Sequence, residues 1–537
     1  MQSWFTFELN GAECRVDGVA TNKTLAQFLA DRGTWPEGPC FAPTDSWAGG
    51  DLVLLATIDA VGRPKYRAVD ATLLFLPMMA GQDIWTWEAF CLMDPGHTVV
   101  RAMRAASLEC GPRAEARLGL LLVEGYYRQD LRWMGQLREQ LDGIVTRTAN
   151  WRAIERVARQ IFAKAERMRH EAEQIAQASG VGKLIQQGRL DVFDDIFSRH
   201  LVAYYPEDDE DLSYVDESKR RFYRPKTLVE LLQLKNQYPD AEVIAGGTGM
   251  GQTAGKSEWE TLISTEDVEE LRVIRKEPNH WEIGAAVTLT SVGETVGRDV
   301  GPLGKLLSRF ASRAVRNRAT LGGNLAIAAT YGQIAPLLIA LDARVHLTSL
   351  EGERDAPMAM FFDRGGKSIL RPGEVIRSIS VPRFTESILE KRGSQSRLCD
   401  AYMVTLRRSL CEPLMTGAFA VELAADGTVK KAWIAYSGVS DRPLRARKAE
   451  KELVGRKWNE KAIMQVLPSV NQEIKIEDDR GNDDYRRQLV ITLFQKFYFQ
   501  HPKVADDVAV ELGAASEFAH PEQPFFDALA LGDKSVL

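Results

Sequence analysis

The stretch Val243-Ile-Ala-Gly-Gly-Thr-Gly-Met-Gly251 decides the fold of the middle of this chain, and Arg316-Asn-Arg-Ala-Thr-Leu-Gly-Gly-Asn-Leu325 repeats its form further on. In each, a hydrophobic stretch runs into a turn of small residues. A loop takes this form when backbone amides must approach a phosphate group closely. One such turn is weak evidence, because any tight turn that needs a positive φ has a similar composition. Two of them, in this order, are much stronger evidence.

The composition is that of a soluble globular protein of several domains. The chain has 537 residues, of which 45% are hydrophobic and 26% charged, and a prior of about 150 residues per domain gives about three to four domains. The net charge of −6 gives no reason to expect nucleic acid or an anionic membrane as a partner. No apolar run is long enough to span a bilayer, and the N-terminus lacks a secretory signal. The six cysteines form no C-x-x-C pair, which favours a cytoplasmic protein.

Hydrophobic periodicity divides the chain into six parts. Short alternating segments around one amphipathic helix signal predict a small α+β domain at the N-terminus. Apolar residues then recur at helical spacing, as at Ile154, Val157 and Ile161, which predicts a helical bundle. The predicted parts are an α+β domain at 1–88, a helical domain at 89–180, a charged linker at 181–222, alternating strands and helices at 223–390, a compact α+β domain at 397–505 and a tail at 506–537.

Both glycine-rich stretches resemble the pyrophosphate-contacting loops of the flavin-binding domain of molybdenum hydroxylases, the xanthine dehydrogenase family. The first resembles the family's A-G-G-T-x-x-G, and the second resembles its I-R-N-x-A-T-x-G-G-N. The resemblance covers nearly all of residues 220–500. It implies a PCMH-type FAD-binding domain of two subdomains at 223–390. A domain like the C-terminal domain of the CO dehydrogenase flavoprotein is implied at 397–505.

The resemblance implies FAD as the cofactor and assigns its contacts to the two loops and one further position. Gln333 stands where the family usually has the acid of a Ser-Pro-x-x-Asp segment. No catalytic residue is assigned. The residues expected to contact FAD are Ala245, Gly246, Gly247, Thr248, Gly249, Met250, Gly251, Thr320, Gly322, Gly323, Asn324 and Gln333.

The family also carries two [2Fe–2S] domains before the flavin domain, a plant-type ferredoxin-like β-grasp domain and a helical domain. Each cluster needs four ligands, which are usually cysteine thiolates. The best register of the first ligand string places Cys40, Ala48, Asp51 and Thr72 at its positions. The second string is present as Cys110-Gly-Pro-Arg113 and Thr146-Arg-Thr148. Alanine, arginine and threonine cannot replace thiolates, so we expect degenerate domains that hold no [2Fe–2S] cluster and no metal, and persist as scaffold.

The expected fold class is therefore α+β multidomain: a ferredoxin-like β-grasp domain, a helical bundle, a two-subdomain PCMH-type FAD-binding domain and a C-terminal α+β domain. The first hypothesis is the FAD-binding subunit of a xanthine-dehydrogenase-like molybdenum hydroxylase complex, a flavin-dependent oxidoreductase subunit that passes electrons between a partner redox centre and an acceptor. It implies a hetero-oligomer with a molybdenum-cofactor-binding large subunit and, as an option, a separate iron–sulfur subunit. The alternative is a structural scaffold subunit, derived from such a dehydrogenase, with no redox role. A free-standing flavin oxidoreductase is a third reading, weaker because its catalytic domain is not evident.

Overall fold

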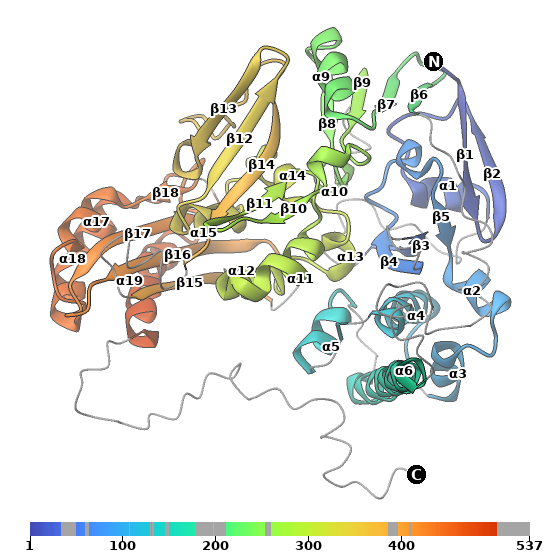
Figure 1. The fold of residues 1–537 in the computed structure, drawn as a ribbon, viewed down its shortest axis with the longest axis horizontal. Helices are drawn as coiled ribbons and strands as arrows, with labels where there is room; N and C mark the ends of the chain where they lie inside the picture. The colour runs from blue at the N-terminus through green and yellow to red at the C-terminus, as the bar shows by residue number, and fades with distance from the viewer. Residues whose placement is uncertain are drawn as a thin grey trace, which may run out of the picture.

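The computed structural model shows an α+β protein whose described residues form four sheets (Figure 1). The N-terminal sheet and the helices below it lie at the right of the view, the middle of the chain lies at the centre, and the C-terminal sheet lies at the left. The structure describes residues 1–33, 50–58, 64–106, 108–128, 130–131, 134–144, 150–178, 197, 211–252, 259–384, 396–407, 411–478 and 480–501.

The N-terminal sheet has the strand order β2-β1-β5-β3-β4, with β1 and β5 parallel. Alternation in Trp4-Phe-Thr-Phe-Glu-Leu9 turns Phe5 and Phe7 inward, onto Phe28 and Leu29 of α1. Thr24 begins that helix with a capping box. The elements are β1 (Trp4–Leu9), β2 (Ala12–Asp17), α1 (Leu25–Asp31), β3 (Leu52–Ile58), β4 (Pro64–Asp70) and β5 (Asp83–Trp85).

Helices follow from residue 87 on. The alternation of Trp85 and Trp87 predicts one strand through both, but β5 ends at Trp85 because Thr86 caps the next helix through a bond from Ala89 N. The helix α4 packs against β3 and β4 on one side and α6 on the other, so its segment Leu118–Val123 is buried all round. The helices are α2 (Trp87–Met93), α3 (Thr98–Ala105), α4 (Pro112–Tyr127), α5 (Met134–Gln140) and α6 (Trp151–Ala178).

The middle of the chain begins with a small sheet of order β6-β7-β9-β8. Its first strand lies inside the stretch predicted to be a linker, at 181–222, and corrects that boundary. Each of the two strands is only four residues long, and the charged turn between them hides the inward alternation of Leu212 and Tyr214. The elements are β6 (Leu212–Val215), β7 (Arg221–Arg224), α9 (Leu228–Gln237), β8 (Glu242–Ile244), α10 (Thr248–Gly251) and β9 (Thr261–Ser264).

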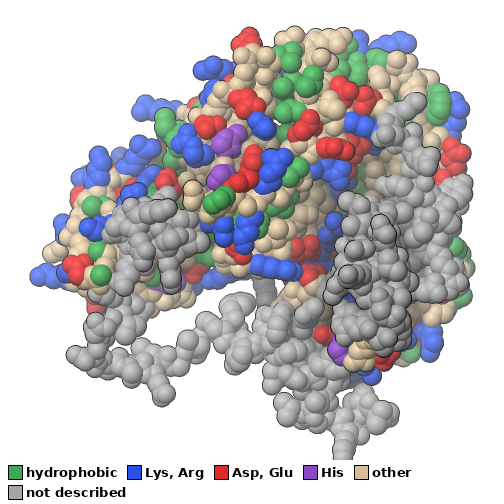
Figure 2. Space-filling view, in the orientation of Figure 1, with side chains coloured by type: hydrophobic (Ala, Val, Ile, Leu, Met, Phe, Trp, Pro, Cys, Tyr) green, Lys and Arg blue, Asp and Glu red, His purple; other side chains and the backbone are tan. Residues whose placement is uncertain are grey.

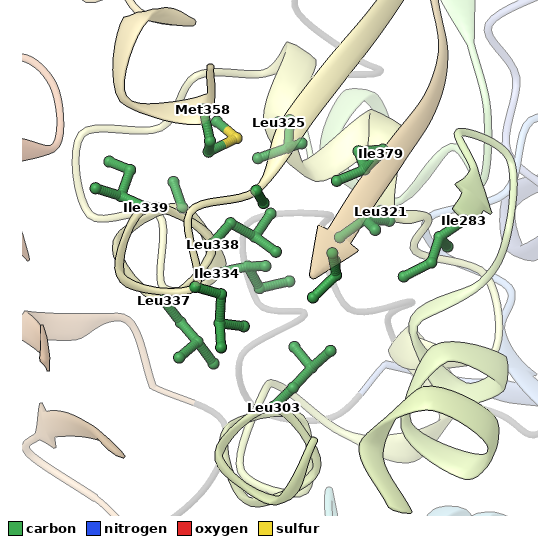
Figure 3. Packing of buried hydrophobic residues seen from close by; sticks show 14 of the residues in the cluster. Ile283, Leu303, Leu321, Leu325, Ile334, Leu337, Leu338, Ile339, Met358 and Ile379 are labelled. Atoms are coloured by element: carbon green, nitrogen blue, oxygen red, sulfur yellow. The ribbon is translucent and has the colours of Figure 1, made fainter. Parts of the chain in front are cut away.

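A second sheet of the middle part has the order β10-β11-β14-β12-β13 and packs against helices. Figure 3 shows Leu321 and Leu325 of α14 pointing into the same core as Leu338 of α15 and Ile379 of β14. The second glycine-rich stretch is therefore anchored by this core. The elements are β10 (Ile274–Lys276), β11 (His280–Gly284), α11 (Leu289–Asp299), α12 (Gly301–Leu307), α13 (Arg313–Arg316), α14 (Leu321–Ala326), α15 (Ile334–Ala340), β12 (Arg344–Ser349), β13 (Gly352–Pro357) and β14 (Val375–Pro382).

The C-terminal domain is an antiparallel sheet of order β15-β16-β17-β18 covered by helices. Asp426-Gly427, a dipeptide typical of a turn, lies between β16 and β17. Phe419 packs against Phe494 and Phe497 of the last helix, with ring centroids 5.3 and 5.5 Å apart. The elements are β15 (Ser396–Thr405), β16 (Pro413–Leu423), β17 (Val429–Ser437), β18 (Leu444–Arg445), α17 (Arg447–Leu453), α18 (Glu460–Glu473) and α19 (Asp483–Gln500).

The N-terminal sheet and the small middle sheet share one hydrophobic core. Tyr214 of β6 lies edge-on to Phe5 of β1, with ring centroids 5.0 Å apart. The two strands also bond through their backbones, since Gln2 N donates to Ser213 O at 2.8 Å and Val215 N donates to Gln2 O at 3.0 Å. These two parts of the protein are therefore one packed unit.

The surface carries both signs of charge. Figure 2 shows Lys and Arg side chains intermingled with Asp and Glu side chains over the described part of one face. A field of one sign, of the kind that attracts nucleic acid, is absent from that part of the face. Within the described residues, no helix is both long enough and apolar enough to cross a membrane.

Candidate flavin site

The first glycine-rich stretch forms a tight turn between β8 and α10. Gly247 has a φ of +76°, a left-handed conformation that costs residues with a Cβ about 1–2 kcal/mol. The Gly251 amide then donates to the Gly247 carbonyl at 2.7 Å. The turn therefore connects β8 directly to α10.

The second stretch runs from α13 into α14. Thr320 begins α14, because its Oγ1 accepts a hydrogen bond from Gly323 N at 3.1 Å. Leu321 N donates to Val287 O at 3.0 Å and fixes the stretch to the segment that precedes α11. The Thr320 hydroxyl is therefore engaged within its own helix cap.

The two stretches touch each other through their backbones. A Cβ on Gly246 would stand 1.7 Å from the carbonyl oxygen of Arg318, so only glycine fits there. The Arg318 guanidinium in turn pairs with the carboxylate of Glu266, which follows β9. The close approach of Gly246 and Arg318 therefore holds two loops that are far apart in the sequence as one unit.

A cavity of about 390 Å³ lies between the two stretches, within the range of roughly 300–1,000 Å³ that is usual for small-molecule and cofactor sites. All of the predicted FAD contacts except Gly251 line it. Gly251 lies behind the turn, where a Cβ would stand 2.3 Å from the carbonyl oxygen of Leu73. Gly251 thus lets the turn pack on the N-terminal domain.

The first stretch offers hydrogen-bond donors to the cavity. In the described part of the chain, the backbone amides of Gly246 and Gly247 and the hydroxyl of Thr248 have no hydrogen-bond partner. Among the lining residues that the structure describes, none is Lys or Arg. An anionic group bound here would be held by successive backbone amides, as in other phosphate-binding loops.

Gln333 offers an acceptor to the same cavity. Its side chain is only 6% exposed, and within the described residues its Oε1 has no hydrogen-bond partner. A buried acceptor left unpaired costs about 1–3 kcal/mol. A ligand that donates a hydrogen bond to Oε1 would remove this cost, so the residues present fit a polar ligand such as FAD.

Several lining residues were not predicted from the sequence, and two of them, Leu73 and Tyr331, come from or border on other domains. Leu73 comes from the N-terminal domain, and its only sequence signal is its place beside Thr72, an expected cluster-ligand position. Tyr331 lies at the border with the C-terminal domain, where burial and then the Glu412 carboxylate raise the pKa of its phenol to about 12. The Arg480 guanidinium stands 5.1 Å from the centre of the Tyr331 ring.

The expected cluster-ligand positions are only partly described. Cys40, Ala48 and Thr146–Thr148 lie outside the described residues. The buried Asp51 carboxylate pairs with Arg113 at 3.8 Å and Arg117 at 3.5 Å. The Thr72 hydroxyl donates to Asp70 at 2.6 Å. Burial raises the pKa of the Cys110 thiol. Among the described residues, no group of three or more His, Cys, Asp or Glu side chains could hold a metal ion.

Comparisons with known proteins match two parts of the chain to families. Residues 217–384 match the FAD binding domain in molybdopterin dehydrogenase, and residues 400–501 match the CO dehydrogenase flavoprotein C-terminal domain. These matches confirm that the sequence predicted both domains correctly.

Curated relatives include xanthine dehydrogenases. That of Emericella nidulans is 24% identical over 92% of this chain and 38% of its own length. The chicken xanthine dehydrogenase/oxidase is 29% identical over 51% of this chain and 21% of its own length. Xanthine dehydrogenase 1 of Arabidopsis thaliana is also 29% identical, over 52% of this chain and 21% of its own length. The chain thus spans well under half of the length of these relatives.

Solved structures similar to this chain include quinoline 2-oxidoreductase from Pseudomonas putida 86. It is 26% identical over 52% of this chain and 94% of that chain, with a TM-score of 0.46. From the two family matches, residues 217–384 are an FAD-binding domain of the molybdopterin dehydrogenase type and residues 400–501 are a CO dehydrogenase flavoprotein C-terminal domain, and this chain is a homologue of flavin-containing oxidoreductases such as xanthine dehydrogenase.

Proposed function

We propose that this chain is the FAD-binding subunit of a xanthine-dehydrogenase-like molybdenum hydroxylase complex, and that it passes electrons between a partner redox centre and an acceptor. The observation that carries the proposal is the cavity between the two glycine-rich stretches. Apart from Leu73, its lining residues belong to the matched FAD-binding domain. Within the described residues, the amides of Gly246 and Gly247 and the Gln333 Oε1 acceptor have no hydrogen-bond partner.

The residues of the cavity fit the parts of FAD by their chemistry. The amides of Gly246 and Gly247 and the hydroxyl of Thr248 would hold the diphosphate. Ala245, Gly249, Met250, Thr320, Gly322, Gly323 and Asn324 would form the walls around it. Gln333 would accept a hydrogen bond from a donor on the flavin or on its ribityl chain. When bound, FAD supplies an electron carrier, while the protein orients it and excludes water from it.

The N-terminal domains would act without iron–sulfur clusters of their own. The alignment with the Emericella nidulans xanthine dehydrogenase covers 92% of this chain and so extends well beyond the two matched domains. At the described ligand positions, Asp51 and Arg113 form an ion pair with each other, and Thr72 bonds to Asp70. These side chains have protein partners, which supports a scaffold role. Electrons would then enter from a partner subunit or from a diffusible donor.

The test is flavin and iron analysis of the full-length protein, purified with whatever accompanies it. We expect flavin absorbance bands, about one FAD per chain after denaturation, and no stoichiometric iron in this chain. Neither flavin nor iron, even after incubation with FAD, would favour the alternative of a structural scaffold. Iron at about four atoms per chain would overturn the proposed loss of both clusters.

A further inference from the structure

A buried carboxylate joins the helical N-terminal domain to the FAD-binding domain. Glu124 lies near the end of α4 and is 0% exposed. It faces β4 on one side and the segment that begins the second glycine-rich stretch on the other. Neither the FAD-binding family match nor the cavity lining includes it.

Both oxygens of Glu124 are fully used. Its Oε1 accepts from Arg313 Nε at 2.8 Å, and its Oε2 accepts from the backbone amide of Ala68 at 3.2 Å. The side-chain amide of Asn317 lies 3.1 Å from each oxygen and also donates to Ala68 O at 2.9 Å. Arg67 adds an ion pair at 3.3 Å. One side chain thus binds two residues of the segment 313–318.

Further ion pairs surround this centre. Glu294 of α11 pairs with Arg313 at 2.6 Å and with Arg67 at 3.3 Å. Glu139 of α5 pairs with Arg316 at 2.9 Å. The positive charges of Arg313 and Arg316 are therefore matched by carboxylates from three helices, two of which belong to the N-terminal half.

The energetics favour an ionised Glu124. Burial by itself raises the pKa of this carboxyl, but Arg313 and Arg67 outweigh burial and hold the pKa below its ordinary value. Breaking a buried ion pair by removing one partner is strongly destabilising, because the other charge is left without compensation. A rearrangement of the segment 313–318 would leave several of these buried charges without an oppositely charged partner at once.

The segment that Glu124 holds leads directly into the cavity. Asn317 precedes Arg318, whose carbonyl oxygen fills the space beside Gly246, and Thr320 and Gly322 of the same stretch line the cavity. Asn317 is also fixed from the FAD-binding side, since Thr290 Oγ1 donates to its Oδ1 at 2.8 Å.

We propose that Glu124 is a positioning residue for FAD: from the N-terminal half, it sets the place of the second glycine-rich stretch relative to the first. The proposal rests on the proposed function, because it requires that the cavity bind FAD. The N-terminal half then has a task that needs no iron, which is to hold one wall of the flavin site in register. Glu124 acts through Asn317 and Arg313 and does not touch FAD.

The experiment compares Glu124→Gln with wild type in the full-length protein, stripped of FAD and titrated with FAD by flavin fluorescence. We expect the dissociation constant of FAD to rise about tenfold or more. Hydrogen exchange of residues 313–323 should become faster in the FAD-free variant. The control is Glu450→Gln, which removes another buried carboxylate paired with an arginine, Arg445, in the C-terminal domain. Its FAD affinity should stay within about twofold of wild type.

The outcomes separate this inference from the function on which it rests. No FAD binding by wild type would remove the proposed function. FAD binding by wild type together with unchanged affinity and unchanged exchange in Glu124→Gln would overturn the positioning role alone. An equal loss of FAD affinity in Glu450→Gln would show that the effect is general destabilisation, and it would also overturn the positioning role of Glu124. If Glu124→Gln does not fold, Asn317→Leu removes the same link from the other side, and the same pair of measurements decides.

Discussion

The carbonyl oxygen of Arg318 occupies the space in which a side chain at Gly246 would begin, because a Cβ there would stand only 1.7 Å from it. Two loops that are far apart in the sequence are thus in backbone contact, and no side chain separates them. The position of each loop therefore depends on the other.

Gly246→Ala tests this dependence directly. The added methyl group must push the loops apart, so we expect loss of bound FAD and a decrease of about 1–3 kcal/mol in the free energy of unfolding, as for other overpacked sites. FAD content per chain and urea denaturation measure the two effects. The matched control is Gly293→Ala in α11, where the nearest atom to a Cβ lies 3.7 Å away. Since alanine favours helix, that variant should be more stable by up to about 1 kcal/mol and keep its FAD.

Gln333→Met should make the FAD-free protein more stable but weaken the binding of FAD. The substitution removes the unpaired buried Oε1, which stabilises the FAD-free protein by about 1–3 kcal/mol. It also removes the acceptor proposed for FAD, so the dissociation constant of FAD should rise. Thermal unfolding with and without saturating FAD measures both. A lower melting temperature of the FAD-free variant would contradict the prediction.

His97 should make stability depend on pH. Its Nδ1 accepts a hydrogen bond from Val99 N at 3.2 Å at the start of α3, and burial lowers its pKa to about 4. The unfolded chain, with a pKa near 6.5 for this group, binds a proton first as pH falls. Stability is therefore complete above about pH 6.5 and is lost progressively toward pH 4, by about 3 kcal/mol in total.

The measurement for His97 is the difference between wild type and His97→Asn in urea denaturation from pH 4 to pH 8. Asparagine keeps a capping acceptor but does not titrate, so the variant should lose this part of the pH dependence. The comparison with the variant is needed because Asp70 and Asp83 also titrate in this range. Burial raises the pKa of each to about 6, so their contribution to stability increases as pH falls, opposite to that of His97. Parallel curves for the two proteins would disprove the role of His97.

Glu422→Leu should destabilise the C-terminal domain without emptying the flavin site. Glu422 is fully buried and pairs with Arg397 at 2.8 Å. Its removal leaves a buried guanidinium with less compensation, so we expect a loss of about 3–5 kcal/mol in the free energy of unfolding. FAD content per folded chain should remain as in wild type. A loss of less than about 1 kcal/mol would mean that the structure around Arg397 rearranges to compensate its charge without Glu422.

Local patterns explain what could be predicted from the sequence. The glycine-rich stretches, the helix through Ile154 and Ile161 and the turn at Asp426-Gly427 all follow from residues close together in the chain. The sequence carries no signal where the deciding contact joins residues that are distant in the chain. Gly251 is explained only by Leu73 of another domain, and the role of Glu124 is visible only once Arg313 lies beside it. The strand at Leu212–Val215 is too short and too close to charged residues to give a periodic pattern.

The hydrophobic core that Phe5 and Tyr214 share has a consequence for any attempt to shorten this chain. Tyr214, Phe222 and Leu262 are buried against residues of the first sheet, so a shortened chain that starts at the middle sheet would present them to water and tend to aggregate. The N-terminal sheet therefore keeps these apolar side chains of the middle sheet away from water. A soluble fragment of this protein has to include that sheet, whatever chemistry the N-terminal residues perform.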